Sequence, residues 1–427
     1  MNTYSETLKT IYSLRGGMID LRLDRMSQAL ALFNHPEKQF PSFHIAGTNG
    51  KGSTAAMLHR ILSQSGYCTA LYTSPHLVSF TERIRVGDEE ISPNEVVALA
   101  QEIWDRTASA NVLLTFFEFV TVMAFIHFYR RDIDVAVVEV GLGGRLDATN
   151  LVRPVVSLIS TISKDHEAYL GSDLLSIARE KGGIIKRGVP VVCGALPTDV
   201  AALLKRMADE REAPSSFLGR DFTFSLKNGD RFDYRGVKWR LNGLDVALRG
   251  QHQKRNAALA LAGLELTAHD FPVKKSALRE GLRTVRWPGR FEIIQDHPAI
   301  VLDGAHNGEG VRALIEELQR FRERRRVRLL FASMDDKDWR LMLDCFSEVV
   351  DEIVLTRVAI ERCADPFQLA SQLSGKVPYR AIQAVPAALQ YLLEHAAFDD
   401  VILVAGSLYL IGEVRPLVQS IAVESPA

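Results

Sequence analysis

The stretch that most constrains the fold of this chain runs from Phe43 to Thr54 and reads Phe-His-Ile-Ala-Gly-Thr-Asn-Gly-Lys-Gly-Ser-Thr. Residues with strand character lead into a glycine-rich turn that carries one lysine, and a helical pattern follows until Gly66. Glycines let backbone N–H groups approach phosphate oxygens, the start of a helix adds partial positive charge, and Lys51 can reach the outer phosphates. The stretch therefore predicts a phosphate-binding loop, with Ser53 or Thr54 facing a magnesium ion.

This loop departs from the general P-loop pattern at two positions. Ile45 stands where that pattern has glycine, and Gly52 stands where it has a hydroxyl residue. The strand, turn and helix that a phosphate loop needs are nonetheless all present. We therefore favour a nucleotide site over the alternative, a glycine-rich turn with a surface lysine.

Length and charge limit the classes of protein to consider. The chain has 427 residues, enough for two domains with full cores. It carries 51 Lys plus Arg and 52 Asp plus Glu, for a net charge of −1. Because no excess basic field exists, we expect no nucleic-acid partner, and phosphate binding must be local.

Cysteine usage and hydropathy predict a cytosolic protein without a membrane span. The cysteines are far apart and are expected to be reduced, buried thiols: Cys68, Cys193, Cys345 and Cys363. Residues Met1 to Thr10 have no apolar segment typical of a signal peptide. Val112 to Tyr129 is apolar on nearly all sides, but Glu118 and His127 interrupt it, so we expect a buried helix there.

Strands alternate with helices along the first part of the chain, which predicts a doubly wound α/β sheet. In such sheets the ligand crevice lies at the carboxyl ends of the strands. The phosphate loop, Ser74, Glu139 and the turn Ser163 to His166 each follow or end a predicted strand, so they should share one edge. The predicted strands are Phe43 to Ala46, Thr69 to Thr73, Asp134 to Val140, Val155 to Ser160 and Val189 to Cys193.

The second half of the chain predicts an insertion and then a second domain. Phe217 to Leu248 is polar and strand-rich, with a turn signal at Asn228-Gly229-Asp230, which indicates a small antiparallel insertion. Trp287 to Phe291 is the candidate linker, because a second α/β alternation follows it. We expect a P-loop ATPase domain over residues 1–288 and a smaller Rossmann-like domain over 289–427. Strands of the latter are predicted at Ile300 to Asp303, Val327 to Ala332, Glu352 to Thr356 and Val401 to Ala405.

Phosphoryl transfer from ATP needs a metal ion, and magnesium prefers oxygen ligands. Glu139 is the leading candidate, because a carboxylate that ends an apolar strand needs a charged partner or a metal. A pair with Arg145 is the alternative. From the residues alone, Lys181 is explained as a surface charge.

The glycines between Gly141 and Gly144 indicate that a substrate approaches the backbone closely, and they do not fit a dinucleotide-binding fingerprint.

Several motifs in the same order resemble the folylpolyglutamate synthase/dihydrofolate synthase branch of the Mur ligase superfamily. They cover nearly the whole chain and are far more specific together than singly. They comprise Gly47 to Ser53, Tyr72 to Leu77, Thr115 to Phe119, Glu139 to Asn150, Asp165-His166, Ala178 to Lys181, Gly250 to Gln253, Trp287 to Arg290, Leu302 to Asn307 and Gly406 to Tyr409.

The resemblance implies roles for individual residues. ATP would contact Thr48, Asn49, Gly50, Lys51, Gly52, Ser53, Asn256, Arg290 and Asp303. Magnesium would be held by Ser74, Glu139, His166 and a carbamylated Lys181. The pteridine-bearing substrate and glutamate would contact Thr115, Phe116, Phe117, Glu118, Leu146, Asp147, Ala148, His306 and Ser407. Catalysis would depend on Lys51, Glu139, His166 and Lys181.

The implied reaction is ATP-dependent addition of L-glutamate to reduced folates, and to dihydropteroate, through an acyl phosphate, by a monomer. Two alternatives stay open, namely another Mur-type ligase acting on a cell-wall precursor and a nucleotide-gated binding protein without ligase activity. The chain departs from the family at Gly308, where proline is usual, and at Ser163-Lys164, which replace a glycine-containing lead and put a cation near the proposed metal site.

Overall fold

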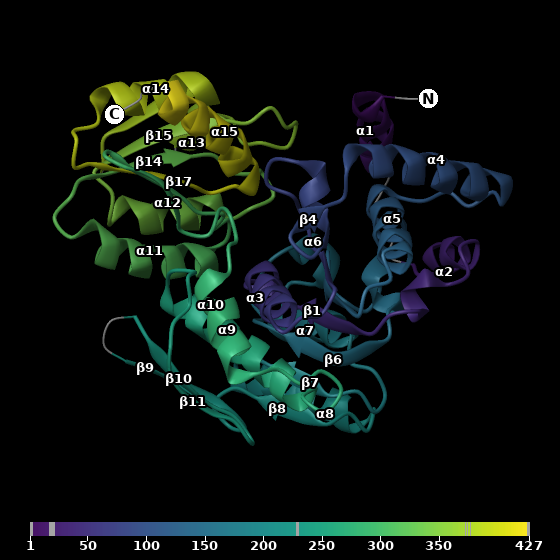
Figure 1. Ribbon diagram of the computed structural model, residues 1–427. Helices are drawn as coiled ribbons and strands as arrows, with labels where there is room; N and C mark the ends of the chain where they lie inside the picture. The colour runs from purple at the N-terminus through teal and green to yellow at the C-terminus, as the bar shows by residue number, and fades with distance from the viewer. Residues whose placement is uncertain are drawn as a thin grey trace. The chain divides into compact units, whose positions relative to one another are not determined.

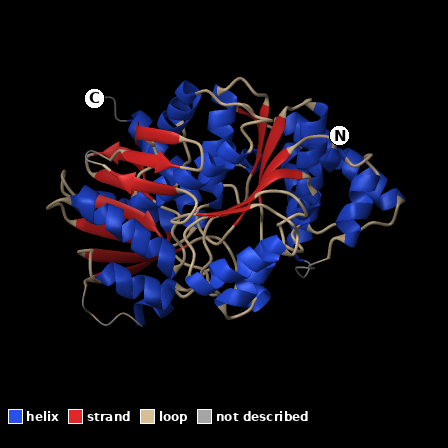
Figure 2. Cartoon of the chain, turned by 90° about the horizontal axis from the view of Figure 1, so that it is seen from below, coloured by secondary structure: helices blue, strands red, loops and turns tan. Residues whose placement is uncertain are grey.

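The chain forms two compact units in the computed structural model, which describes residues 3–16, 22–227, 230–371, 373, 375 and 377–424. The first unit comprises Met1–Ala247 and Gln253–Arg286, and the second comprises Leu248–His252 and Trp287–Ala427. Both have the predicted α/β architecture, with helices flanking the strands of each sheet (Figure 2). Among the described helices, none is long and apolar enough to cross a membrane.

The first unit is built on an eight-stranded sheet of order β4-β3-β2-β5-β1-β6-β7-β8. All neighbours from β2 to β8 pair in parallel, while β3 and β4 pair antiparallel at one edge. We predicted a loop where β3 and β4 lie, because charged residues interrupt this short hairpin, as is common in edge strands. The strands are β1 (Ser42–Ala46), β2 (Thr69–Tyr72), β3 (Ile84–Val86), β4 (Glu89–Glu90), β5 (Val135–Glu139), β6 (Pro154–Ile159), β7 (Val191–Cys193) and β8 (Ser215–Phe217).

Helices cover both faces of this sheet. Helix α3 packs against β1, β2 and β5, and α10 packs against α3. The predicted buried helix is α5, whose middle is buried on nearly all sides. The helices are α1 (Tyr4–Ser13), α2 (Asp24–Ala31), α3 (Lys51–Gln64), α4 (Pro93–Ser109), α5 (Phe116–Arg130), α6 (Glu167–Leu170), α7 (Leu174–Gly182), α8 (Thr198–Asp209), α9 (Gln251–Leu266) and α10 (Lys275–Thr284).

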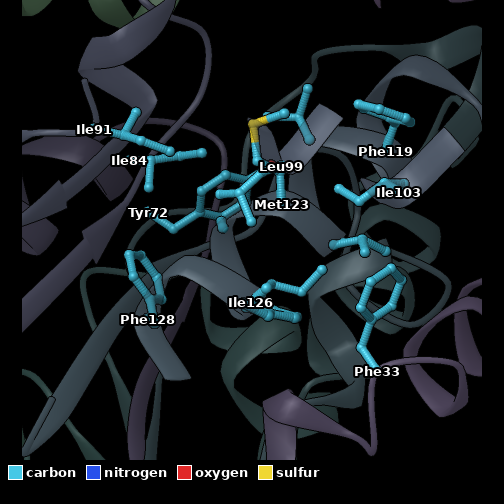
Figure 3. Close-up of a cluster of buried hydrophobic side chains, with 14 of the residues drawn as sticks. Phe33, Tyr72, Ile84, Ile91, Leu99, Ile103, Phe119, Met123, Ile126 and Phe128 are labelled. Carbon is cyan, nitrogen blue, oxygen red and sulfur yellow. The ribbon is translucent and has the colours of Figure 1, made fainter. Parts of the chain in front are cut away.

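One large hydrophobic cluster fixes α5 against the sheet. Tyr72 from β2 and Phe119, Met123 and Phe128 from α5 belong to it, and Leu99 adds a contact from α4 (Figure 3). The Tyr72 hydroxyl is paired with that of Thr121 at 2.9 Å, so the one polar atom of this ring is satisfied. This packing fixes where the N-terminal turn of α5 lies relative to the sheet.

The predicted antiparallel insertion is present as a three-stranded sheet, β11-β10-β9 (Figure 1). Its strands are β9 (Thr223–Leu226), β10 (Phe232–Arg235) and β11 (Arg240–Leu244), all antiparallel. The turn predicted at Asn228 and Gly229 lies outside the described residues.

The second unit has a six-stranded sheet of order β12-β13-β17-β14-β15-β16. Only β12 is antiparallel. We did not predict β12 and β16, which lie at the two edges of the sheet and contain no fully buried residue. The strands are β12 (Glu292–Asp296), β13 (Ala299–Leu302), β14 (Val327–Phe331), β15 (Glu352–Arg357), β16 (Tyr379–Ala384) and β17 (Val401–Ala405). The helices are α11 (Gly308–Arg322), α12 (Trp339–Ser347), α13 (Pro366–Ser371), α14 (Val385–His395) and α15 (Leu408–Glu424).

Candidate active site

Four neighbouring strands of the first sheet end at one edge, where candidate site residues end or follow them. Glu139 ends β5, Gly47 follows β1, Ser74 closely follows β2, and Ser160 follows β6. Because β2, β5, β1 and β6 are parallel neighbours, their carboxyl ends lie side by side. The structure therefore brings the predicted phosphate loop and the predicted metal ligand Glu139 to the same edge of the sheet.

The phosphate loop is held by the segment that follows β6. The N–H of Thr48 donates to the Thr161 carbonyl at 2.8 Å, and the N–H of Asn49 donates to the Thr161 hydroxyl at 3.1 Å. The Ser160 hydroxyl donates to the Asn49 carbonyl at 2.6 Å. Gly47 packs so closely on Ser160 that a Cβ at this position would overlap it. Sequence reasoning missed these supports, although the polar run after β6 was a usable signal.

The end of the loop packs against Asn256 of α9. Gly50 has a left-handed φ of +84°, and a Cβ there would lie 2.5 Å from the Asn256 Oδ1. Glycine is required here for both reasons. Helix α3 begins at the next residue, Lys51, so its first N–H groups lie at the loop, as a phosphate site requires. Asn256, which the resemblance implies as a nucleotide contact, is thus adjacent to the loop.

Two lysine side chains converge on one carbonyl oxygen. Lys51 Nζ donates to the Gly47 carbonyl at 3.0 Å and to the Thr48 carbonyl at 3.1 Å, and Lys181 Nζ donates to the Gly47 carbonyl at 3.0 Å. Lys181 is only 6% exposed, so its interpretation as a surface charge is wrong. Burial, followed by the nearby Lys51 charge, lowers the pKa of Lys181 to about 7. Lys181 lies near the end of helix α7, whose first turn is capped by Asp173.

Glu139 lies buried beside the loop that carries Ser74. Its carboxylate accepts a hydrogen bond from the N–H of Ser74 at 3.2 Å, and the residue is 5% exposed. Arg145, the alternative partner, instead pairs with Glu180 at 2.9 Å. His166 directly precedes α6 with a left-handed φ of 52°, and its Nε2 lies 3.9 Å from an Asp165 oxygen.

The donor set of the proposed metal site is mixed. Across the described ranges, no group of three or more His, Cys, Asp or Glu side chains could hold a metal ion. A divalent ion at this edge would therefore need oxygen donors of another kind, such as the hydroxyl of Ser74, beside the Glu139 carboxylate. Lys164, the cation expected to disturb this site, is largely exposed and lies 3.9 Å from Glu167.

The N-terminal turn of α5 carries the residues predicted to contact the substrate. Thr115 caps the helix, and the Glu118 carboxylate accepts a hydrogen bond from the Thr115 N–H at 2.8 Å, which completes a capping box. Glu118 also forms an ion pair with Arg25 at 3.1 Å. The Arg15 guanidinium lies 4.4 Å from the centre of the Phe116 ring. The Glu118 carboxylate is therefore engaged by the Thr115 N–H and by Arg25. The rings of Phe116 and Phe117 are the part of this turn that can offer an apolar surface to a substrate.

The glycines after β5 allow close contacts within the protein itself. A Cβ at Gly141 would overlap the ring of Phe117, and one at Gly144 would lie 2.8 Å from the Glu180 carbonyl oxygen. Our interpretation that a substrate approaches this backbone is therefore corrected, because the Phe117 ring and the backbone of α7 fill that space. The following residues Leu146, Asp147 and Ala148 lead into the turn η4 (Ala148–Leu151).

The second unit gathers its own predicted site residues where β13 and β17 end. Asp303 accepts hydrogen bonds from the N–H groups of Phe291 and Ala305, each at 2.8 Å. Burial raises the pKa of Asp303, and the charge of Arg290 opposes that rise. His306 follows β13, and its Nδ1 lies 2.8 Å from the Gly304 carbonyl oxygen. Ser407 follows β17, and its hydroxyl accepts a hydrogen bond from the N–H of Tyr409 at 3.1 Å.

The remaining departure from the family, Gly308, starts α11. Asn307 caps this helix, and its Oδ1 accepts from the N–H of Gly310 at 2.8 Å. The cap holds the start of the helix without the proline that is usual there. Cys193 and Cys363 are buried as predicted, but the prediction of burial was wrong for Cys68, which is exposed, and for Cys345, which is only partly buried.

Comparison with known proteins identifies the family. Residues 45–264 match the Mur ligase middle domain, and residues 289–408 match the Mur ligase glutamate ligase domain. A Bacillus subtilis dihydrofolate synthase/folylpolyglutamate synthase is 34% identical over 411 residues, which cover 92% of this chain and 94% of that protein. This chain belongs to the folylpolyglutamate synthase/dihydrofolate synthase family of Mur ligases.

Solved structures of this family have the same fold. Escherichia coli FolC in complex with DHPP and ADP superposes with a TM-score of 0.91 at 31% identity, covering 99% of each chain. A Yersinia pestis bifunctional folylpolyglutamate synthase/dihydrofolate synthase complexed with AMPPNP and a Mn ion gives a TM-score of 0.88 at 33% identity, covering 98% of each chain. The predicted α/β fold and the predicted class of ATP-dependent Mur-type ligase are confirmed.

Proposed function

We propose that this member of the folylpolyglutamate synthase/dihydrofolate synthase family joins L-glutamate to reduced folates, and also to dihydropteroate, at the expense of ATP. One observation carries the proposal. The glycine-rich loop with Lys51 and the buried carboxylate Glu139 lie at the same edge of one sheet, in a chain that matches family members along nearly its whole length. A phosphate cradle next to an acid is what activation of a carboxylate by ATP requires.

The reaction has two steps with balanced bonds. A carboxylate oxygen of the pteroate or folate attacks the γ-phosphorus of ATP, and ADP leaves with the electrons of the broken P–O bond. The amine of glutamate then attacks the carbonyl carbon of the acyl phosphate, loses a proton, and displaces inorganic phosphate. Lys51 and the first N–H groups of α3 stabilise the charge on the transferred phosphoryl group.

Four residues would hold a magnesium ion, namely Ser74, Glu139, His166 and Lys181 as its carbamate. When bound, the ion neutralises charge on the phosphate oxygens. The buried Glu139 carboxylate next to Ser74 supports this set, and the Mn ion in the Yersinia pestis relative supports a divalent ion. We expect chelation by EDTA to abolish ADP release and either Mg²⁺ or Mn²⁺ to restore it. Unchanged ADP release in EDTA would contradict a metal requirement.

Carbamylation of Lys181 fits its surroundings. Its amine is buried beside a second ammonium group, and this burial favours the neutral amine that reacts with CO₂. The product keeps the nitrogen, adds a carboxylate and releases a proton. A ¹³C carbamate resonance should appear in protein equilibrated with ¹³C-bicarbonate and be missing from Lys181→Arg. A resonance of equal intensity in that variant would place the carbamate elsewhere.

The second unit supplies the remaining contacts in this proposal. Arg290 and Asp303 would contact the nucleotide, and His306 and Ser407 would contact glutamate. Their position at the carboxyl ends of β13 and β17 supports such a role, since ligands of parallel sheets bind there. The functional boundary that we propose divides residues 1–288 from 289–427.

We further infer a cytosolic monomer. The four cysteines are free, which suits a reducing compartment. Size-exclusion chromatography with light scattering should give the mass of one chain, 47.5 kDa. A stable dimer across the micromolar range would contradict this part of the proposal.

The proposal is tested by substrate-dependent ADP release. Purified protein with ATP, magnesium and L-glutamate should release ADP with tetrahydrofolate, and also with dihydropteroate. Release with tetrahydrofolate alone would restrict the activity to folylpolyglutamate synthase. Absence of turnover with both acceptors would contradict the proposal and favour a cell-wall-type ligase or a nucleotide-gated binding protein.

A further inference from the structure

The three-stranded insertion is fixed to the last turns of α9 by a buried carboxylate. Glu265, which is 7% exposed, accepts hydrogen bonds from the Tyr234 hydroxyl at 2.7 Å and from the N–H of Trp239 at 2.6 Å. The N–H of Lys238 donates to the same carboxylate. Gly236 packs on it so closely that a Cβ there would overlap a carboxylate oxygen. Strand β10 and the turn that follows it are therefore held against this end of the helix.

A buried lysine fixes the insertion to the other end of α9. Lys254 lies in the first turn of the helix, is only 3% exposed, and donates from Nζ to an Asp230 carboxylate oxygen at 2.9 Å. Asp230 lies just before β10 and is itself largely exposed. Because a buried ammonium group is costly without a charged or polar partner, this contact ties the start of α9 to the insertion.

The insertion and the phosphate loop contact opposite faces of α9. About three helical turns separate Lys254 from Glu265, so both residues lie on the same face of the helix. Asn256 follows Lys254 by two residues and therefore points to nearly the opposite side. There it packs against Gly50, where a Cβ would lie 2.5 Å from the Asn256 Oδ1. Figure 1 shows β9, β10 and β11 beside α9.

The Asn256 side chain moves with the backbone of α9. Its Nδ2 donates to the Gln253 Oε1 at 3.0 Å, and both residues are buried. Because this hydrogen bond lies within the helix, it does not hold Asn256 in place at Gly50 when the helix shifts or rotates. The position of Asn256 at the phosphate loop therefore depends on what fixes α9 from outside.

We propose that the insertion is a brace that keeps Asn256 at the phosphate loop, and that Lys254 and Glu265 are positioning residues for ATP binding. This inference rests on the proposed function, because it takes Asn256 and the loop as nucleotide contacts. It deepens that function by giving a part in nucleotide binding to the insertion, from which the proposed site takes no residue. Lys254 and Glu265 act through Asn256 and do not touch ATP.

Lys254→Met tests the first end of the brace, because it removes the ammonium group and keeps an unbranched side chain. We expect the dissociation constant for ATP, measured by isothermal titration calorimetry, to rise about tenfold, since a small displacement of a binding group has a large effect. The KM for tetrahydrofolate should stay within about twofold. Lys254→Arg keeps the charge and should bind ATP as the wild type does. Lys227→Met is the matched control, because Lys227 pairs with Asp233 within the insertion at 3.3 Å.

Two milder variants keep the test decisive if Lys254→Met does not fold. Asp230→Asn changes an exposed side chain and replaces the ion pair by a weaker hydrogen bond, so the dissociation constant for ATP should rise several-fold. Tyr234→Phe removes the hydroxyl donor to Glu265 and should change ATP binding in the same direction. Hydrogen exchange of residues 47–52 should be faster in both variants and unchanged in Lys227→Met.

The brace is overturned if Lys254→Met, or Asp230→Asn in its place, binds ATP as tightly as Lys227→Met does, even where the free energy of unfolding has fallen. An equal rise in the dissociation constant for ATP and in the KM for tetrahydrofolate would show general loosening of the first unit, and would overturn the brace as well. Unchanged ATP binding by Tyr234→Phe would overturn the role of Glu265.

The proposed function fails in a distinguishable way. Wild-type protein that binds ATP but releases no ADP with either acceptor would overturn the proposed function, and the dissociation constants of the variants would still decide the brace. Active wild-type protein, together with variants of unchanged ATP affinity, would overturn only the brace.

Discussion

The Gly47 carbonyl oxygen is the point where the two lysines of the proposed site meet. Lys51 and Lys181 each place Nζ 3.0 Å from it. A phosphate oxygen carries negative charge, so an incoming phosphate gives Lys51 a stronger partner than the neutral carbonyl oxygens it contacts here. We infer that Lys51 turns from its own loop toward the phosphates when ATP binds.

Replacing Lys51 by alanine should therefore abolish ATP binding without unfolding the protein. The Lys51 ammonium group supplies a positive charge at the phosphate loop, and we expect ATP affinity to fall by about a hundredfold or more, measured by isothermal titration calorimetry. Lys205→Ala is the matched control, since this partly exposed lysine lies on α8 and pairs with Asp209. An ATP affinity of Lys51→Ala equal to that of the control would show that the loop does not bind phosphate through this residue.

His44 provides a second prediction at the residue scale, because burial lowers its pKa to about 3, with a smaller contribution from the Lys186 charge. In the unfolded chain the His44 imidazole takes up a proton near its ordinary pKa of 6.5, whereas in the folded protein it stays neutral at that pH. The stability that a neutral His44 provides is thus complete above pH 6.5 and is lost progressively as the pH falls toward 3.

His44→Gln should make the protein less sensitive to acid, because glutamine does not titrate. Between pH 7 and pH 5 the wild type should lose about 2 kcal/mol more of its free energy of unfolding than the variant. Urea unfolding of both proteins at the two pH values measures this difference, and the other histidines cancel in the comparison. Equal losses would show that His44 is protonated in the folded protein.

At the scale of elements, the start of α5 both caps the helix and forms part of the proposed substrate site. Thr115 and Glu118 form a capping box with the same chemistry as Ser92 and Glu95 at the start of α4. Both pairs satisfy N–H groups that would otherwise lack a partner. Only the cap of α5 lies next to Phe117, which packs on Gly141 in the proposed site.

The two caps allow a matched pair of substitutions. Thr115→Ala and Ser92→Ala should each lower the free energy of unfolding by about 1 kcal/mol, because each leaves one helix end uncapped. Only Thr115→Ala should also raise the KM for tetrahydrofolate, by several-fold. Thermal unfolding and steady-state kinetics measure the two effects. Equal kinetic effects of both substitutions would place the substrate away from the start of α5.

At the scale of the whole molecule, the sequence predicted what depends on local pattern. The strand, glycine turn and helix around Lys51 and the apolar run ending at Glu139 specify parallel strands with a site at their carboxyl ends. The burial of Lys181 could not be predicted, because its helix has charged neighbours and the covering segments come from distant parts of the chain. The buried contact between His44 and Thr149 likewise joins residues that are 105 positions apart in the chain.

The chain also passes between its two units three times, after Ala247, after His252 and after Arg286. Sequence reasoning anticipated only the last of these crossings, because Trp287 to Phe291 has a linker composition. The short excursion Leu248–His252 belongs to the second unit although it is flanked by residues of the first. Which unit this segment belongs to depends on its packing against residues distant in the sequence, and a local sequence pattern does not predict such packing.

The central claim, that ATP activates the carboxylate of the substrate as an acyl phosphate, has a direct isotopic test. Tetrahydrofolate carrying ¹⁸O in its terminal carboxylates is turned over with ATP and glutamate, and the inorganic phosphate released is analysed by mass spectrometry. We predict that each phosphate carries one ¹⁸O atom from the substrate. Phosphate without ¹⁸O, released together with ADP, would contradict the account.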